Sequence, residues 1–136
     1  MSHRLTVRGV IAAALAFCSA AASAAQPVAS VPELDLSRYA GQWHEIAHLP
    51  MFFQRQCVGD ITARYSLDAP GKIGVLNACR TKDGSMDQSQ GVARPVEGHP
   101  GRLEVRFAPD WLSWLPAVWA DYWVIALDPD YQWAMV

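Results

Sequence analysis

The sequence lacks a long hydrophobic run, a strong charge of either sign, internal repeats and low-complexity segments. Its apolar stretch Val10 to Phe17 is too short for a membrane-spanning helix, which needs about 20 residues. Charged residues make up only 18%, and the formal net charge is −2. We therefore expect no nucleic-acid partner, because a polybasic surface is missing. With 136 residues, 51% of them hydrophobic, the chain has the composition of one globular domain.

The N-terminus has the pattern of a secretory signal. His3, Arg4 and Arg8 give a basic start, an apolar stretch follows, and Ala22-Ser23-Ala24 offers small residues at both recognition positions of a signal peptidase. We expect a signal peptide over residues 1–24, a linker over 25–33 and one domain over 34–136. The alternative is an uncleaved anchor.

Cysteine is scarce, with only three in the chain. A lipoprotein signal needs a small residue before the lipidated cysteine, but Phe17 precedes Cys18, so we expect cleavage after Ala24 instead. The product would then be exported to the periplasm or associated with the outer membrane. Cys57 and Cys79 remain, and an even count in a small exported domain predicts a disulfide bond. The alternative is two buried thiols.

No segment after residue 40 has a helical period. Apolar and polar residues alternate instead, most clearly from Ile61 to Leu67 and from Leu103 to Phe107, and turn-forming residues separate the alternating segments. This pattern predicts an all-β barrel or sandwich. The expected strands number seven and cover about 42–48, 57–67, 72–80, 86–94, 102–108, 119–128 and 131–136.

One segment, His44-Glu45-Ile46-Ala47-His48, matches the zinc-protease pattern H-E-x-x-H. That chemistry requires a helix, in which residues i and i+4 share a face. The segment lies between Gly41 and Pro50 and is expected to be a strand, which would place the two histidines about 13 Å apart. Zinc–nitrogen bonds are only about 2.0–2.1 Å long, so one zinc ion would not reach both. We interpret the match as accidental and expect no metal, no cofactor and no catalysis.

Three sequence blocks resemble the lipocalin family, in its bacterial outer-membrane and apolipoprotein D-like branch. The first, LSRYAGQWHEIAHLPMFFQRQC, contains the G-x-W motif at Gly41-Gln42-Trp43; ITARYSLDAPGKIGVLNACR and ADYWVIALDPDYQWAMV follow in the family's order. The resemblance implies an up-and-down antiparallel β-barrel whose narrow end is closed by Trp43. It also implies an eighth strand and a C-terminal helix, so we expect a C-terminally truncated domain with free edges at its first and last strands.

The resemblance also implies a lipophilic ligand inside the barrel. The expected inward faces are apolar and suit the acyl chain of a fatty acid or lysophospholipid, for transport or storage. The alternatives are a filled core, a lipocalin-fold interaction or structural protein without ligand, and a lipocalin-fold enzyme. The expected ligand-binding residues are Trp43, Ile61, Ala63, Tyr65, Val75, Val105, Phe107 and Tyr122.

An unusual loop, Asp110 to Trp119, contains three tryptophans, two leucines and no basic residue. Tryptophan favours membrane interfaces, and an exposed apolar patch often marks a binding surface. The loop therefore predicts contact with a membrane surface or with a second copy in a homodimer. Packing of the loop against its own barrel is the equal alternative. The residues expected to make the contact are Trp111, Leu112, Trp114 and Leu115.

Overall fold

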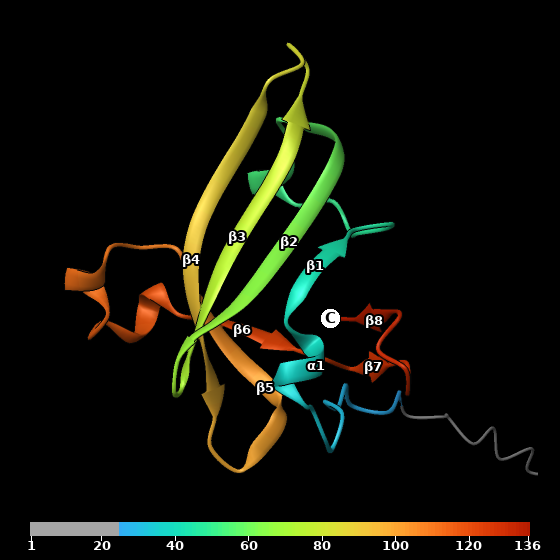
Figure 1. Cartoon of the computed structure of the whole chain (residues 1–136), viewed down its shortest axis with the longest axis vertical. Coiled ribbons are helices and arrows are strands. Elements are labelled where there is room, and N and C mark those ends of the chain that lie inside the picture. Colours follow the sequence, from blue (N-terminus) through green and yellow to red (C-terminus); the bar gives the residue numbers. More distant parts are fainter. Residues whose placement is uncertain (1–24) are drawn as a thin grey trace, which may run out of the picture.

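A computed structural model describes residues 25–136, so the expected signal peptide, with Cys18, lies outside the described residues. The fold is almost entirely antiparallel β-structure (Figure 1). Among residues 25–136 the one α-helix, α1, is Leu36–Tyr39, and the short 3-10 helices are Phe52–Gln54, Asp110–Leu112 and Pro116–Val118. Over these residues, none of the helices has the length and apolar character to cross a membrane. The strands are β1 (Gly41–His44), β2 (Cys57–Ala69), β3 (Lys72–Thr81), β4 (Met86–Val96), β5 (His99–Arg106), β6 (Ala120–Trp123), β7 (Ala126–Leu127) and β8 (Ala134–Met135).

Strands β1 to β6 form one sheet in the order of the chain, each pairing antiparallel with the next. Tight turns join β2 to β3 and β4 to β5, where Gly71 and Gly98 have φ angles of 71° and 74°. These left-handed conformations favour glycine, because glycine has no Cβ that would clash with the backbone. The up-and-down antiparallel arrangement expected from the alternating sequence is therefore confirmed.

The sheet curls on itself, so that its two ends approach each other. The hydroxyl of Tyr65 in β2 donates a hydrogen bond to the hydroxyl of Tyr122 in β6, at 2.9 Å. In a flat sheet these strands would be about 19 Å apart, because neighbouring strands are about 4.8 Å apart. The contact therefore requires the curvature of a barrel. In the described part of the chain, β1 and β6 do not pair with each other.

The segment with the H-E-x-x-H pattern is not a continuous strand, which corrects the expectation for 42–48. Strand β1 ends at His44, and only the amide of Glu45 adds one more bond, to the carbonyl of Ile61 at 3.0 Å. The reason lies in the partner strand. The register of β2 shifts twice before Thr62, and Asp60 there has a φ of 52°, so β2 offers no regular edge beyond that point.

The C-terminal region also differs from the expected strands 119–128 and 131–136. After β6, Val124 still bonds to the carbonyl of Gly101 at 2.9 Å, but its own carbonyl accepts the amide of Val31 at 2.8 Å. The chain then leaves the large sheet, and β7 pairs with β8 in a separate two-stranded sheet. Figure 1 shows this hairpin beside α1, where Arg38 donates to the carbonyl of Pro129 at 3.0 Å.

The segment expected to be a linker, residues 25–33, is partly packed onto the domain. A side chain at Gly101 would collide with the carbonyl of Val31, so glycine allows this close approach. The core gathers at the same end of the sheet. Its buried residues are Tyr39, Tyr65, Ile73, Val75, Ala93, Leu103 and Val124.

A disulfide bond joins Cys57, the first residue of β2, to Cys79 in β3, as expected from the cysteine count. Their Cα atoms are 5.6 Å apart, within the usual range for a disulfide. The bond closes the far end of the β2–β3 pair, at the opposite end from its tight turn.

Candidate ligand-binding face

The concave side of the curled sheet carries four rows of directly paired residues. Residues that pair directly across antiparallel strands point to the same side of the sheet, so each row forms a continuous strip. No charged side chain belongs to any of these rows. From the register they are Gly41, Tyr65, Val75 and Gly91; Trp43, Ala63, Asn77 and Ser89; Leu67, Ile73, Ala93, Val105 and Ala120; and Pro95, Leu103 and Tyr122.

Trp43 is placed at the base of this face by the short helix α1. The carboxylate of Asp35 caps α1 by accepting the amides of Ser37 and Arg38, which fixes the helix immediately before β1. The indole Nε1 of Trp43 then donates to the carbonyl of Tyr39 at 2.8 Å, and the two rings lie 4.9 Å apart. Trp43 therefore belongs to the floor of the barrel, the position that the G-x-W motif implies.

Three tyrosine hydroxyls meet above the floor. The Tyr122 hydroxyl lies 2.8 Å from that of Tyr39 and 2.9 Å from that of Tyr65. Burial raises the pKa of Tyr39 to about 12 and also raises the pKa values of Tyr65 and Tyr122. The three phenols, which we call the tyrosine triad, are therefore neutral at physiological pH and act as hydrogen-bonding groups rather than as bases.

Sequence reasoning missed Tyr39, although it named the other two tyrosines. The available signal was local, because the Asp35 cap and the following Gly41 place Tyr39 in the last turn before β1. Its partner Tyr122 is 83 residues away in the chain. Only the curvature of the sheet brings the two hydroxyls together.

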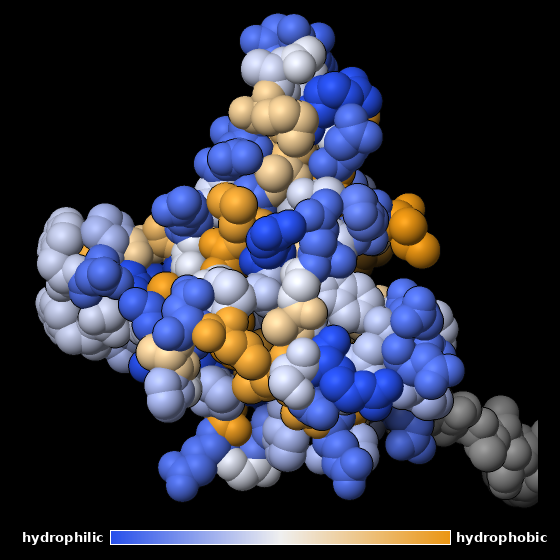
Figure 2. Space-filling model, in the orientation of Figure 1, coloured by the Kyte–Doolittle hydropathy of each residue, from blue (hydrophilic) through white to orange (hydrophobic). Residues whose placement is uncertain are grey.

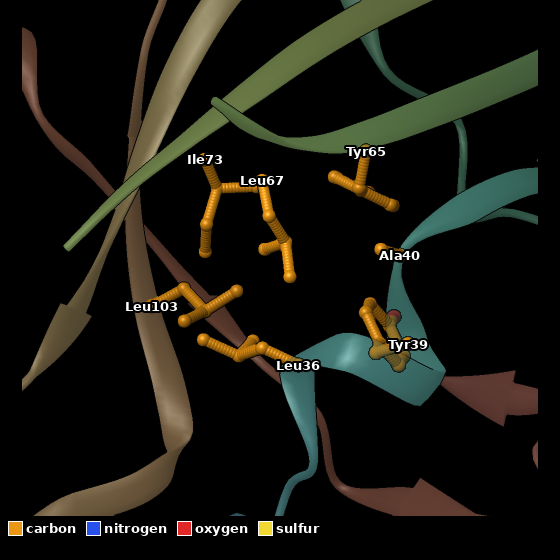
Figure 3. Close-up of a pocket in the computed structure, with 7 residues that line it drawn as sticks. All are labelled: Leu36, Tyr39, Ala40, Tyr65, Leu67, Ile73 and Leu103. Atoms are coloured by element: carbon orange, nitrogen blue, oxygen red, sulfur yellow. The ribbon is translucent and has the colours of Figure 1, made fainter. Parts of the chain in front are cut away.

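The floor itself is filled. Figure 3 shows a gap that Tyr39 and Tyr65 of the triad line together with apolar side chains, a cavity of about 10 Å³. A single water molecule needs about 10–15 Å³ of such space, so an acyl chain does not fit here. A ligand would have to lie on the concave face above this gap. The residues that line it are Leu36, Tyr39, Ala40, Tyr65, Leu67, Ile73 and Leu103.

Six of the eight expected ligand-binding residues belong to the paired rows of the concave face, and Ile61 and Phe107 are outside those pairs. Tyr65 and Val75 are buried, whereas Phe107 is 45% exposed. A Cβ on Gly91 would approach the ring of Phe107 to 2.8 Å, so this ring lies over the concave row that contains Gly91. The others, all half-buried, are Trp43, Ile61, Ala63, Val105 and Tyr122.

The H-E-x-x-H segment has no zinc-site geometry. The His48 ring contacts the carboxylate of Glu45, which also accepts a bond from Gln54 at 3.1 Å. Glu45 is thus engaged with its own loop. Within residues 25–136, no group of three or more histidine, cysteine, aspartate or glutamate side chains is arranged to hold a metal ion.

The tryptophan-rich loop separates into two parts. The ring of Trp119 packs against both Arg94 and Arg106, whose guanidinium carbons are 3.9 Å and 5.2 Å from its centre. Trp111 and Trp114, in contrast, are 73% and 75% exposed, and Leu112 and Leu115 are half-buried. Local packing therefore accounts for one tryptophan of the loop and leaves the other two on the surface.

Comparison with known proteins places this fold in a family. Residues 34–136 match the model of the lipocalin-like domain. The chain is 39% identical over 109 residues to temperature-induced lipocalin-1 of Arabidopsis thaliana, covering 78% of this chain and 58% of that protein. It is 42% identical over 96 residues to apolipoprotein D of Macaca fascicularis, covering 69% and 46%. It is 36% identical over 131 residues to the outer membrane lipoprotein Blc of Escherichia coli, covering 93% and 70%.

A solved structure supports the fold. The crystal structure of the cockroach major allergen Per a 4 superposes with a TM-score of 0.56 at 20% identity, covering 76% of this chain and 58% of that one. The chain spans about half the length of the first curated relatives that it matches. The family match, these relatives and the curled antiparallel sheet agree: the chain belongs to the lipocalin family, in the branch of apolipoprotein D and Blc.

Proposed function

We propose that this protein is an exported carrier that holds a fatty acid or lysophospholipid against its concave face, for transport or storage, and that it catalyses no reaction. The proposed compartment is the periplasm or the surface of the outer membrane. Binding of small lipophilic ligands is the coarser function that its lipocalin relatives suggest.

The observation that carries the proposal is the uncharged part of the concave face, which ends where Asp87 pairs with Cys79. Toward the closed end, beside α1, its rows are buried in the core, as Ile73 and Leu103 show. The accessible part is the row of Trp43, Ala63, Asn77 and Ser89, together with the ring of Phe107 over Gly91. Such a surface favours an acyl chain, because each methylene removed from water contributes about 0.8 kcal/mol. The neutral tyrosine triad offers hydrogen bonds but no base, which supports binding without catalysis.

Two observations support export. The disulfide between Cys57 and Cys79 fits an oxidising compartment outside the cytoplasm. The relative Blc is by name an outer membrane lipoprotein, and it matches 93% of this chain. We extend the envelope location to this protein on those grounds.

The first test measures affinity for saturated fatty acids of increasing length, by displacement of a fluorescent fatty acid. Each added methylene should tighten binding about fourfold until the face is covered, since 0.8 kcal/mol corresponds to that ratio. An affinity that does not change with chain length would contradict a site on the concave face. No binding of either lipid class would favour an interaction or structural protein without ligand.

The second test places a charge on the proposed face. Phe107→Lys should weaken fatty-acid binding by about tenfold or more, because it removes apolar contact and puts an ammonium group on the face. Met86→Lys is the matched control. Met86 is 53% exposed, against 45% for Phe107, but it pairs with Arg80 on the other side of the sheet. Equal losses in both variants would refute the location of the site.

A further inference from the structure

A polar cleft of about 480 Å³ lies at the open end of the sheet, the end opposite α1. It is bounded by residues 55–56, just before β2, and by the β3–β4 turn from Thr81 to Asp87, and we call it the rim cleft. Figure 1 shows the β3–β4 hairpin extending at the top of the view, and in Figure 2 the tip of this hairpin has the blue and white of hydrophilic residues. The volume is within the range of small-molecule sites, about 300–1,000 Å³.

The rim cleft continues the concave face. Side chains alternate along a strand, so Thr81 in β3 points to the same side of the sheet as Asn77. In β4, Asp87 likewise points to the same side as Ser89. Asn77 and Ser89 pair in the accessible row of the concave face, and Asp87 lies about 7 Å beyond that row along its strand. A lipid whose acyl chain lies on the concave face would therefore place its headgroup in the rim cleft.

Two contacts fix the wall of the rim cleft that carries Arg55. The side-chain amide of Gln56 donates to the carboxylate of Asp87 in β4 at 3.1 Å, across the intervening strand β3. The disulfide then joins the next residue, Cys57, to Cys79 in β3. The chain is thus attached to the rim at both of the positions that follow Arg55.

Neutral donors already bind the two carboxylates of the rim cleft. Asp87 accepts the amide of Gln56, and Asp83 accepts bonds from within its own turn. The hydroxyls of Thr81 and Ser85 donate to Asp83 at 2.5 Å and 2.7 Å, and the backbone amide of Ser85 donates at 3.0 Å. These bonds lower the pKa of Asp83 to about 2, so its carboxylate stays ionised and bound to the turn.

The two cations of the rim cleft, in contrast, have no carboxylate partner among the described residues. The arginines that form ion pairs with carboxylates are Arg80, Arg94 and Arg106. Arg55 and Lys82 form none, and both are exposed. A guanidinium offers a planar fork of donors that matches phosphate oxygens, and an ammonium adds a compact positive charge. The missing partner in the cleft is therefore an anion with several oxygens.

We propose that Arg55 and Lys82 bind the phosphate of an anionic single-chain phospholipid and make the protein prefer this headgroup to an uncharged one. A phosphate monoester carries about −1.5 to −2 charges at pH 7 and three acceptor oxygens, enough to contact both cations. A fatty-acid carboxylate offers only one charge and two oxygens. The proposal rests on the carrier function proposed above, because it assigns the headgroup of the lipid that the concave face holds.

The experiment compares two lipids that differ only in the phosphate, a monoacylglycerol and the lysophosphatidic acid with the same acyl chain. Isothermal titration calorimetry measures both affinities. The wild type should bind lysophosphatidic acid about tenfold or more tightly, because its phosphate gains charge-assisted hydrogen bonds. High salt should reduce this preference, since exposed charges are screened. In Arg55→Gln/Lys82→Gln the two lipids should bind equally, and monoacylglycerol should keep its wild-type affinity.

The matched control is Arg64→Gln/Lys72→Gln. It removes the same two kinds of charge from exposed positions outside the cleft, because Arg64 pairs with Leu76 on the outer side of the sheet and Lys72 begins β3 at the closed end. This variant should keep the full preference for lysophosphatidic acid. Equal binding of the two lipids by the wild type would overturn the proposal. An unchanged preference in Arg55→Gln/Lys82→Gln, or an equal loss in the control, would also overturn it.

Three further ligands separate the possible sources of the anion. Lysophosphatidylcholine, whose quaternary ammonium cancels the phosphate charge, and the free fatty acid of the same chain should both bind less tightly than lysophosphatidic acid. Equal affinity of either one would overturn the preference for an anionic phosphate headgroup. Inorganic phosphate should compete only weakly, because it has no acyl chain; strong competition would assign the cleft to free phosphate instead. Monoacylglycerol binding that tightens with chain length, without a preference for phosphate, would refute the rim cleft alone and leave the carrier function intact.

Discussion

The two ends of the strands are built differently. At the closed end, around α1 and the tight turns of β2–β3 and β4–β5, large apolar side chains are buried, as Leu103 and Val124 show. At the open end, the connections carry large apolar side chains that contact solvent, and Ile46 there is 96% exposed. The contrast separates two regions: the closed end holds the fold together, and the open end presents apolar side chains to solvent.

The contrast follows from the lengths of the connections. At the closed end, the turns between β2 and β3 and between β4 and β5 are too short to extend beyond the sheet. The segments between β1 and β2 and between β5 and β6 are long enough to fold into 3-10 turns of their own, beyond the reach of the core. The disulfide between Cys57 and Cys79 lies at this open end, where hydrophobic burial is least.

The largest effect should come from the closed end. Leu103→Ala should lower the free energy of unfolding by about 2–5 kcal/mol, because it leaves a cavity beside a residue that is almost completely buried. Leu49→Ala removes the same atoms from an exposed position at the open end and should change stability by less than about 0.5 kcal/mol. Urea denaturation of both variants measures the difference. Similar losses would show that the open end also contributes to the core.

Removal of the disulfide should have the next largest effect. The Cys57→Ser/Cys79→Ser variant should lose about 3 kcal/mol, the chain-entropy value for a closed loop of this size. The expected consequence is local as well as global: amide hydrogen exchange should increase first at the open ends of β2 and β3 and last in the tyrosine triad. Uniform loss of protection along both strands would contradict the separation of the two ends.

Alkaline pH should weaken the closed end selectively. Burial raises the pKa of Tyr39 to about 12 in the folded protein, against about 10 in an unfolded chain. Below pH 10 the Tyr39 hydroxyl is protonated in both the folded and the unfolded state, so the stability of the folded state is unaffected by its titration. Between pH 10 and 12 the unfolded state loses this proton first, and the free energy of unfolding therefore falls. Two pKa units correspond to about 3 kcal/mol at most. Tyr39→Phe should have a smaller decrease in melting temperature from pH 10 to pH 12 than the wild type.

Sequence alone was sufficient where the information is local. Alternation from Ile61 to Leu67 predicted a strand with one apolar face, and glycine and proline marked the turns between strands. The cap of α1 is local in the same way, because Asp35 accepts amides only two and three residues further along the chain. Two cysteines in a domain expected to be exported predicted the disulfide. Each of these features depends on neighbours in the chain or on residue type.

Sequence failed where a strand depends on its partner. The segment after His44 leaves the sheet because β2 has no regular edge before Thr62 with which it could pair. The expected strand 119–128 divides at Val124, because the carbonyl of Val124 accepts the amide of Val31 instead of pairing within the sheet. Val31 belongs to a segment that was expected to be a linker. Neither event is visible in the local pattern, since both partners are distant in the chain.

The amino-acid sequence by itself determined the class of fold, the family and the apolar face, because period-two alternation fixes which side chains share one side of a strand. Only the tertiary structure decided which distant groups meet. Curvature of the sheet brings Tyr39, Tyr65 and Tyr122 together, and the contacts of Arg94 and Arg106 with Trp119 leave Trp111 and Trp114 exposed. The physical reason is that alternation specifies a direction for each side chain, whereas the identity of its neighbour depends on how the whole sheet bends.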